Sequence, residues 1–198
     1  MHPIDLRSDT VTLPTNEMLE AISKAELGDD VFQEDPTVNK LEHSAAKTFN
    51  KESAIFMPSG TMANLVAILT HCQRGDEVIL GDQSHTFLYE AGGISSFGGV
   101  HSRQIKNYDD GTMSLEDVKN SIRKKDVHFP PSRLVCLENT HNRCFGMPLD
   151  INYINKVSEI VKNNSMMLHV DGARIFNAAA ALNKSVAELT SEVDSVSF

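Results

Sequence analysis

The chain has 198 residues, enough for one ordinary domain with a sizeable core, and its 40% hydrophobic and 23% charged residues are typical of a globular protein. A formal net charge of -9 disfavours nucleic acid or an anionic membrane surface as the main partner, because either would require a basic face. No apolar run is long enough to cross a bilayer. The 3 cysteines include no C-x-x-C pair, which disfavours a disulfide framework or a zinc ribbon and favours a reducing compartment, the cytoplasm.

The first quarter of the chain is predicted to be an extended arm followed by helices. Residues 1–14 predict the arm, and Thr15 or Asn16 can cap a helix that runs to about Ala25. Asp35-Pro36 is a strong helix start, because the acid caps the helix and proline suits the first helical position. One apolar face of this helix is predicted from Val38, Leu41, Ala45 and Phe49.

Strands and helices alternate over the rest of the chain. Short apolar runs predict strands at residues 53–57, 77–80, 100–105, 134–137, 166–171 and 194–198. Helices are predicted at residues 62–69, 86–91 and 185–189, and after Ser114, Asp150 and Arg174. This alternation predicts an α/β fold with a mainly parallel sheet flanked by helices.

A turn of small residues, Pro58-Ser59-Gly60-Thr61, precedes the helix at residues 62–69, for which Gly75 is a candidate C-cap. That helix shows one apolar face, made of Met62, Leu65, Val66 and Leu69. A strand, a small-residue turn and a helix point backbone N–H groups at a phosphate, helped by the helix dipole. An ordinary strand-to-helix turn also favours Ser, Gly and Thr, so both interpretations stay open. Neither G-x-G-x-x-G nor G-x-x-x-x-G-K-[ST] occurs, which disfavours a dinucleotide fold or a P-loop NTPase.

The stretch from Met166 to Arg174 combines an apolar strand with an acid at its end. Ligands of open α/β sheets bind outside the carboxyl ends of the strands, which is where Asp171 stands, with Arg174 one helical turn beyond. A buried acid there is costly unless a cation meets it, and the pyridinium nitrogen of pyridoxal phosphate (PLP) is one such cation. A structural pair between Asp171 and Arg174 is the alternative interpretation.

Several histidines invite a zinc hypothesis, but their spacing matches no compact ligand pattern, so we expect no metal site. They are His85, His128, His141 and His169. His169 alternates with buried neighbours and is predicted to be a hydrogen-bonded core histidine. Cys136, inside an apolar strand, is predicted to be buried and inert.

A set of motifs in fixed order connects these residues to a known family. The motifs are Leu6-Arg7-Ser8-Asp9-Thr10, Gly28-Asp29-Asp30-Val31, Glu34-Asp35-Pro36-Thr37-Val38, Pro58-Ser59-Gly60-Thr61-Met62-Ala63-Asn64, Tyr89-Glu90-Ala91-Gly92-Gly93, Leu137-Glu138-Asn139-Thr140-His141 and His169-Val170-Asp171-Gly172-Ala173-Arg174. Over nearly its whole length the chain resembles the low-specificity L-threonine aldolases, PLP enzymes of the aspartate-aminotransferase fold.

The resemblance implies a role for each matching residue. Ser59, Gly60 and Thr61 would hold the PLP phosphate, and Asp171 would pair with the pyridinium nitrogen. His85 would stack on the pyridine ring, bind cofactor in this way, and act in catalysis near the substrate hydroxyl. His128 would approach the same hydroxyl as a second catalytic and substrate-binding residue. Ser8, Tyr89 and Arg174 would also contact the substrate. Arg174 would belong to the cofactor site as well, and its guanidinium group suits a substrate carboxylate.

The implied reaction is a retro-aldol cleavage of L-threonine or L-allo-threonine to glycine and acetaldehyde, which serves threonine catabolism and glycine formation. The family forms homodimers or homotetramers with sites between subunits, so a homo-oligomer is expected. β-Elimination by a related PLP enzyme is a further possibility, although Ser8-Asp9-Thr10 combined with Glu138-Asn139-Thr140-His141 favours the aldolase.

Three departures from the family pattern accompany the resemblance. Phe32-Gln33 replaces the usual Tyr-Gly, and the turn from Arg143 to Pro148 is shorter than the family's glycine-rich turn. Residues 1–198 correspond to the N-terminal arm and the PLP-binding large domain, and are expected to stop before the Schiff-base lysine and the small domain. The alternative function is therefore a non-catalytic remnant or partner subunit without that lysine.

Overall fold

A computed structural model describes residues 4–198, which form two compact units. The first comprises the chain up to Ala46 together with Ser53–Phe56, and the second comprises Lys47–Glu52 and Met57–Phe198. No helix in the described part of the chain is long and apolar enough to span a membrane.

The first unit is helical, and each of its helices begins at a polar cap. It contains the 3-10 turns η1 (Asp9–Val11) and η2 (Asp30–Phe32), the helix α1 (Asn16–Ser23) and most of α2 (Pro36–Phe49). The Thr15 hydroxyl accepts a hydrogen bond from the Met18 N–H, as the sequence predicts for the start of α1. The Asp35 carboxylate accepts from the N–H groups of Thr37 and Val38 at the start of α2. Between residues 4 and 14 the arm has no regular structure apart from η1.

The strand predicted at residues 53–57 is wrong, because this segment has no regular structure. Ile55 is 71% exposed, and the Phe56 N–H donates to the Glu42 carboxylate instead of to a neighbouring strand. An apolar run that short becomes a strand only where a partner strand supplies hydrogen bonds, and none does here.

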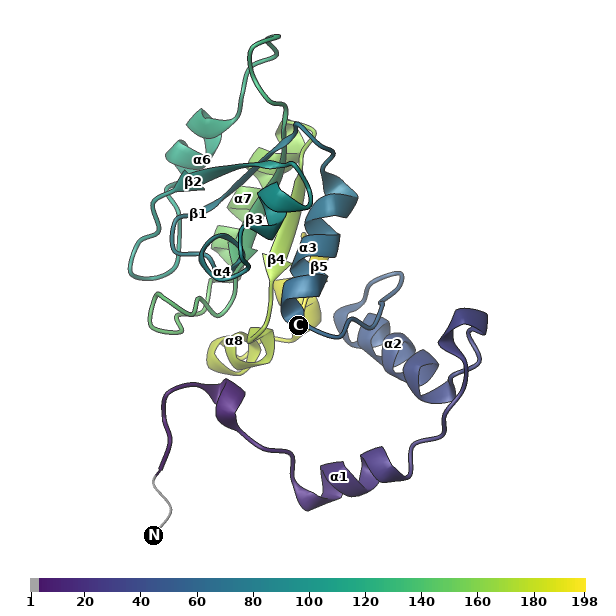
Figure 1. The fold of residues 1–198 in the computed structure, drawn as a ribbon. Coiled ribbons are helices and arrows are strands. Elements are labelled where there is room, and N and C mark those ends of the chain that lie inside the picture. Colours follow the sequence, from purple (N-terminus) through teal and green to yellow (C-terminus); the bar gives the residue numbers. More distant parts are fainter. Residues whose placement is uncertain (1–3) are drawn as a thin grey trace. The chain divides into compact units, whose positions relative to one another are not determined.

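The second unit is built on a parallel sheet of five strands in the order β2-β1-β3-β4-β5 (Figure 1). The strands are β1 (Glu77–Gly81), β2 (His101–Ile105), β3 (Ser132–Glu138), β4 (Met167–Asp171) and β5 (Ser195–Ser197). The α/β class, the parallel sheet and these five strands are thus confirmed. The register pairs Glu138 with Asp171, and Asp171 with Ser197, so the ends of three strands are level.

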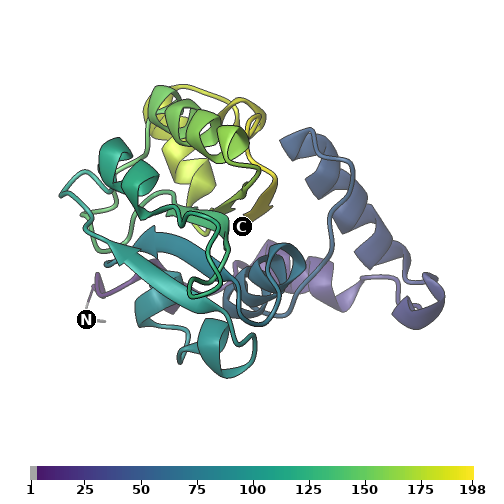
Figure 2. The ribbon, with the colours of Figure 1, turned by 90° about the horizontal axis from the view of Figure 1, so that it is seen from above.

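Helices cover both faces of the sheet (Figures 1 and 2). They are α3 (Gly60–His71), α4 (His85–Leu88), α5 (Gly93–Ser96), α6 (Leu115–Ser121), α7 (Ile151–Asn163), α8 (Ile175–Leu182) and α9 (Val186–Leu189). On one face, residues of α6 and α7 form a buried cluster with side chains of β1, β3 and β4. On the other face, α3 and α5 pack against the alternate side chains of β1 and β3. Both faces of the central strands are therefore buried, as their continuous apolar sequences predict.

The sequence identified the wrong face of α3. The helix buries Asn64 and Ile68, whereas Met62 is 44% and Leu69 is 39% exposed. Apolar periodicity alone could not find this face, because one of its two buried members is an amide. The predicted C-cap is also wrong, since α3 ends at His71 and Gly75 lies in the turn before β1 with a φ of +91°.

Candidate active site

The candidate site lies at the carboxyl edge of the sheet, where strand ends from distant parts of the sequence meet. Glu138 ends β3, Asp171 ends β4, and His85 begins α4 just after β1. The N-terminal half of α3 brings Asn64 to the same place, where its amide lies 2.9 Å from the Asp171 carboxylate. This position is where parallel α/β sheets bind ligands.

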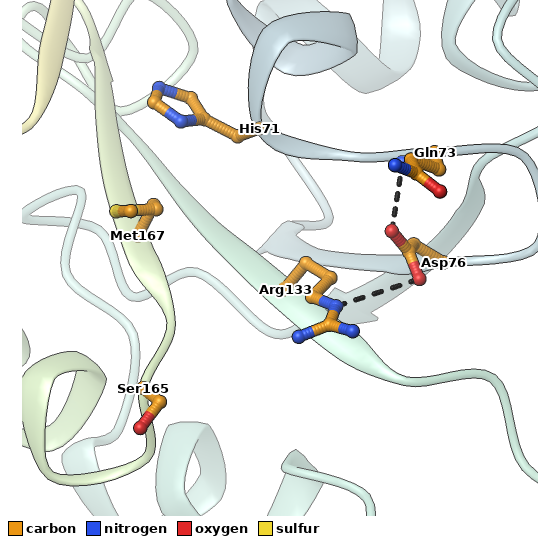
Figure 3. A pocket seen from close by; sticks show the side chains of 6 residues that line it. All are labelled: His71, Gln73, Asp76, Arg133, Ser165 and Met167. Carbon is orange, nitrogen blue, oxygen red and sulfur yellow. Dashed lines mark hydrogen bonds and ion pairs between the residues drawn. The ribbon is translucent and has the colours of Figure 1, made fainter.

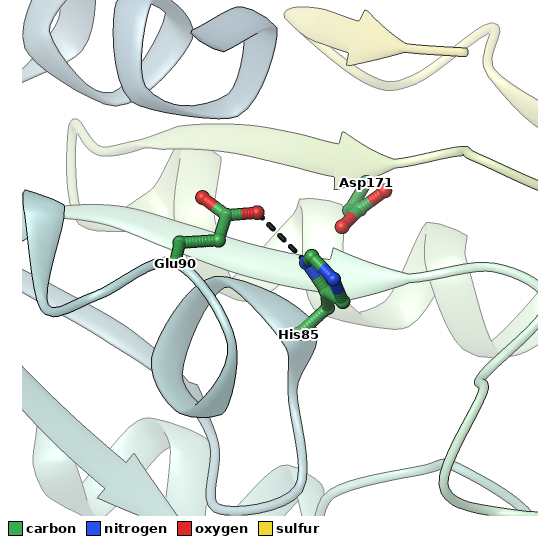
Figure 4. Close-up of side chains that lie close together, drawn as sticks. All are labelled: His85, Glu90 and Asp171. Carbon is green, nitrogen blue, oxygen red and sulfur yellow. Dashed lines mark hydrogen bonds and ion pairs between the residues drawn. The ribbon is translucent and has the colours of Figure 1, made fainter. Parts of the chain in front are cut away.

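Three ionisable side chains meet closely there (Figure 4). The imidazole of His85 and the carboxylates of Glu90 and Asp171 each offer one ligand atom within 4.8 Å of the others. Nδ1 of His85 lies 2.9 Å from Oε1 of Glu90. The side chain of His85 is 38% exposed while that of Glu90 is 2% exposed, so the imidazole closes one side of a buried pair of acids.

Asp171 is a buried carboxylate whose hydrogen-bond donors are neutral. It is 5% exposed and accepts hydrogen bonds from the Asn64 side-chain amide and the Ala173 backbone N–H. Burial, followed by the neighbouring Glu138 carboxylate, raises the pKa of Asp171, although these two hydrogen bonds act in the opposite direction. A cation against this carboxylate would offset the cost of burying it. The protonated ring nitrogen of PLP has that charge, so this donor set fits the cofactor.

The start of α3 supplies the other half of a PLP site. The Ser59 hydroxyl caps the helix by accepting a hydrogen bond from the Met62 N–H. A Cβ built on Gly60 would meet no atom within 4 Å, so space lies open beside the first helical residue. With Thr61, these residues form an exposed helix N-terminus of the kind that binds phosphate.

Tyr89 and Arg174 belong to the same region of the second unit. The rings of Tyr89 and His85 have centroids 5.6 Å apart, and the Tyr89 hydroxyl accepts a hydrogen bond of 2.6 Å from Arg143. Arg174 is half-buried at the N-cap of α8, three residues beyond Asp171. Its positive charge acts on Glu138 and lowers the pKa of that acid, against the larger effect of burial.

The remaining two predicted site residues are His128 and Ser8. His128 is an exposed side chain bonded to Asp126, on the loop between α6 and β3 at the top of Figure 1. That loop enters β3 at its amino end, so one chain does not bring His128 to the carboxyl edge. Ser8 lies in the first unit, where it caps η1. The roles predicted for His128 and Ser8 therefore stay predictions.

A pocket of about 280 Å³ opens at the opposite edge of the sheet (Figure 3). It is lined by His71, Gln73, Asp76, Arg133, Ser165 and Met167. Arg133 and Asp76 form an ion pair at 3.6 Å, so the two charged side chains of the lining partly neutralise each other. Because this pocket adjoins the amino ends of β3 and β4, it is separate from the cluster around Asp171.

Sequence reasoning missed three members of the site, Asn64, Glu90 and Glu138. Glu138 carries the same signal as Asp171, an acid that ends an apolar strand, and its carboxylate accepts from the backbone N–H groups of His85 and Asn142. Burial raises the pKa of Glu138 and of Glu90. Asn64 could be noticed only as a polar residue among the small and apolar residues of α3.

Two predictions about core residues are confirmed. His169 is fully buried, its Nδ1 lies 2.9 Å from the Ser195 hydroxyl and its Nε2 lies 3.2 Å from Oδ1 of Asn64. Burial lowers the pKa of His169 to about 4, which keeps the imidazole neutral. Cys136 is buried, and burial raises the pKa of its thiol well above the usual range, so it is not a reactive thiolate.

The sequence profile of the beta-eliminating lyase family matches residues 5–198. The chain belongs to the beta-eliminating lyase family. It is 52% identical over 198 residues to the probable low-specificity L-threonine aldolase 2 of Arabidopsis thaliana, covering 98% of this chain and 56% of that protein. It is 48% identical over 192 residues to the low specificity L-threonine aldolase of Escherichia coli (strain K12), covering 97% and 57%.

A solved structure agrees with the sequence relatives. The crystal structure of a putative L-allo-threonine aldolase from Listeria monocytogenes EGD-E superposes with a TM-score of 0.75 at 26% identity, covering 90% of this chain and 48% of that one. The predicted resemblance to the threonine aldolases and to the large domain of the aspartate-aminotransferase fold is therefore confirmed, and PLP is the cofactor of this family. The chain spans about half the length of the curated relatives it matches.

Proposed function

We propose that the full-length protein carrying this chain is a PLP-dependent lyase that cleaves L-threonine or L-allo-threonine to glycine and acetaldehyde. One observation carries the proposal: the buried Asp171 faces His85 at the carboxyl edge of the sheet, with neutral hydrogen-bond donors around its carboxylate. The threonine aldolases to which the chain is similar support the same reaction.

Each residue of the site has a task that follows from its chemistry. Ser59, Gly60 and Thr61 would hold the phosphate of PLP at the start of α3, and Asp171 would hold a proton on the ring nitrogen. His85 would lie against the ring and take the proton of the substrate hydroxyl. Arg174 would bind the substrate carboxylate by a bidentate contact. When bound, PLP serves as the electron sink for cleavage of the Cα–Cβ bond.

The remaining parts of the proposal concern the other substrate contacts, the assembly and the rest of the chain. Ser8 and His128 would contact the substrate, and Tyr89 would line the pocket beside His85. We propose a homo-oligomer, in which a second subunit supplies His128, and a cytoplasmic location. We also propose that residues 1–198 form the arm and large domain, and that the Schiff-base lysine lies further along the full-length chain.

The experiment is a cleavage assay of the full-length protein loaded with PLP. Purified protein is incubated separately with L-threonine and L-allo-threonine, glycine is quantified, and acetaldehyde is followed by its reduction with NADH and alcohol dehydrogenase. L-Serine is tested in parallel for pyruvate and ammonia, the products of β-elimination. Cleavage of at least one threonine isomer is expected. Turnover of neither isomer would refute the proposal, and pyruvate from L-serine alone would assign an eliminating enzyme.

A further inference from the structure

The side chain of Asn64 lies between Glu90, which contacts His85, and Asp171, the acid proposed to meet the ring nitrogen of the cofactor. It is 2% exposed, and both polar atoms of its side chain are used twice. Its Nδ2 donates to Oε1 of Glu90 at 2.8 Å and to Oδ2 of Asp171 at 2.9 Å. Its Oδ1 accepts from the Ser197 hydroxyl at 2.6 Å and from Nε2 of His169 at 3.2 Å. The hydrogen-bonding capacity of this buried amide is therefore fully used, by two acids of the site, by His169 of β4 and by Ser197 of β5.

The carboxylates of Glu90 and Asp171 determine which way this amide points, and the contacts around β5 are compatible with that orientation. Nε2 of His71 lies 2.8 Å from the Ser195 hydroxyl, which lies 2.9 Å from Nδ1 of His169. In a neutral His169, a Ser195 hydroxyl that donates to Nδ1 leaves the ring proton on Nε2, and that proton is donated to Oδ1 of Asn64. A reversed amide would point its oxygen at the oxygens of two carboxylates, which only accept when they are ionised. The Asn64 N–H groups therefore face Glu90 and Asp171.

The contact between Glu90 and His85 determines in turn which ring nitrogen of His85 carries the proton. Its Oε1 accepts from Asn64 and also meets Nδ1 of His85 at 2.9 Å. An ionised carboxylate oxygen only accepts, so beside an ionised Glu90 the proton of a neutral His85 ring lies on Nδ1. Nε2 of the neutral imidazole then carries the free electron pair. The exposure of the two side chains places Nδ1 on the buried side, against Glu90, and leaves the outer part of the ring at the mouth of the site.

We propose that Glu90, held in place by Asn64, is a positioning residue that keeps His85 in the Nδ1–H tautomer with Nε2 ready to accept a proton. The reaction in which Nε2 would accept it, the cleavage of the substrate Cα–Cβ bond, rests on the proposed function. The tautomer itself does not, because every contact that sets it lies within this chain. A carboxylate that orients a histidine in this way also stabilises the imidazolium that forms when the proton is taken.

Two substitutions at Glu90 separate positioning from packing. Glu90→Leu keeps a branched side chain of similar bulk but removes the acceptor for His85. Glu90→Gln keeps an oxygen that can accept from both His85 and Asn64, as Oε1 does now, while it removes the charge and replaces the second oxygen with an NH2 group. Glu77→Leu is the matched control, because Glu77 is also fully buried but lies at the amino end of β1, bonded to Arg123 and Ser132.

The test measures the tautomer and the kinetics of the full-length protein. The ¹⁵N chemical shifts of histidine side chains are recorded for the PLP-free protein, and the His85 signals are assigned by their loss in His85→Asn. Wild type, Glu90→Gln and Glu77→Leu are expected in the Nδ1–H form, and Glu90→Leu is expected to move toward Nε2–H. In the holoenzyme, kcat should fall about 10- to 100-fold in Glu90→Leu and less in Glu90→Gln, with KM changed less than about threefold.

The outcomes distinguish this inference from the proposed function. An Nε2–H tautomer in the wild-type protein would overturn the inference even if Glu90→Leu fails to fold. Equal losses of kcat in both Glu90 variants, with the tautomer unchanged, would also overturn it and leave Glu90 as a packing residue. Wild-type protein that shows the Nδ1–H form but cleaves no threonine would refute the proposed function alone.

Discussion

Gly60 offers a substitution that should affect cofactor binding and protein stability in opposite directions. It is the first residue of α3, its φ is not positive, and a Cβ built on it meets nothing within 4 Å. Gly60→Ala should therefore cause no clash within the chain. Because alanine restricts the unfolded chain more than glycine does, the free energy of unfolding of the PLP-free protein should stay constant or rise by about 0.4–1 kcal/mol.

The same methyl group should weaken PLP binding. If the phosphate binds at this helix start, it occupies the space beside Gly60. The methyl group of alanine would then displace the phosphate from the backbone N–H groups. Losing one charge-assisted hydrogen bond costs about 1.5–3 kcal/mol. That energy corresponds to an increase of about 10- to 150-fold in the Kd for PLP.

Both the stability and the affinity for PLP can be measured on the full-length protein. Urea unfolding of the PLP-free form gives the stability, and titration with PLP followed by its visible absorbance gives the affinity. Gly81→Ala is the control, because its Cβ would lie 2.0 Å from Oδ1 of Asn107 and should destabilise the fold by about 1–3 kcal/mol. A Gly60→Ala protein that binds PLP as tightly as wild type would refute the assignment of the phosphate to the start of α3.

Three further predictions concern the carboxyl edge and the core. Asp171→Asn should retain PLP but lower turnover roughly 10²–10³-fold, since a neutral amide cannot hold the ring nitrogen protonated; near-normal kcat would make Asp171 a structural residue. Because burial raises the pKa values of Glu90, Glu138 and Asp171, their contribution to the stability of the PLP-free protein is present at acidic pH and is lost as the pH rises above about 4. Urea unfolding at pH 5 and pH 7 should show a smaller loss in Asp171→Asn than in wild type, and an equal or larger loss would contradict the assigned sign. Ile68→Ala should lower the free energy of unfolding by about 2–5 kcal/mol and Leu69→Ala by less than half of that, because Ile68 is fully buried and Leu69 is 39% exposed. Equal urea midpoints for the two variants would instead support the buried face of α3 predicted from the sequence.

The sequence predicted most of the sheet because its signals are local. Each of the five strands is a short run of residues bounded by a glycine, a proline or an acid, and most helices begin at a polar cap that is next to them in the sequence. Asp171 was predictable for the same reason, since the end of a buried parallel strand is a ligand-binding position. The segment at residues 53–57 shows the limit of this reasoning, because its apolar composition resembles that of a strand but no partner strand lies beside it.

The parts that could not be predicted depend on contacts between distant residues. Asn64 has no distinguishing local pattern, and its function appears only when Glu90, Asp171 and Ser197 are brought to it from 26, 107 and 133 residues away. The wrong face of α3 has the same origin. A buried amide is acceptable in a helix only where all its hydrogen bonds are satisfied, and the satisfying groups come from three other segments.

The three acids of the carboxyl edge also connect folding to cofactor binding. Glu90, Glu138 and Asp171 are each about 5% exposed, and burial raises the pKa of each, so burying their charges opposes folding at neutral pH. A ligand that binds the folded protein and brings a positive charge to Asp171 offsets this cost, and it stabilises the native state by a free energy that rises with the logarithm of the ligand concentration. Asn64 extends that effect to β5, because the amide that meets Asp171 also accepts from Ser197. Occupation of the cofactor site should therefore also stabilise the edge strand β5.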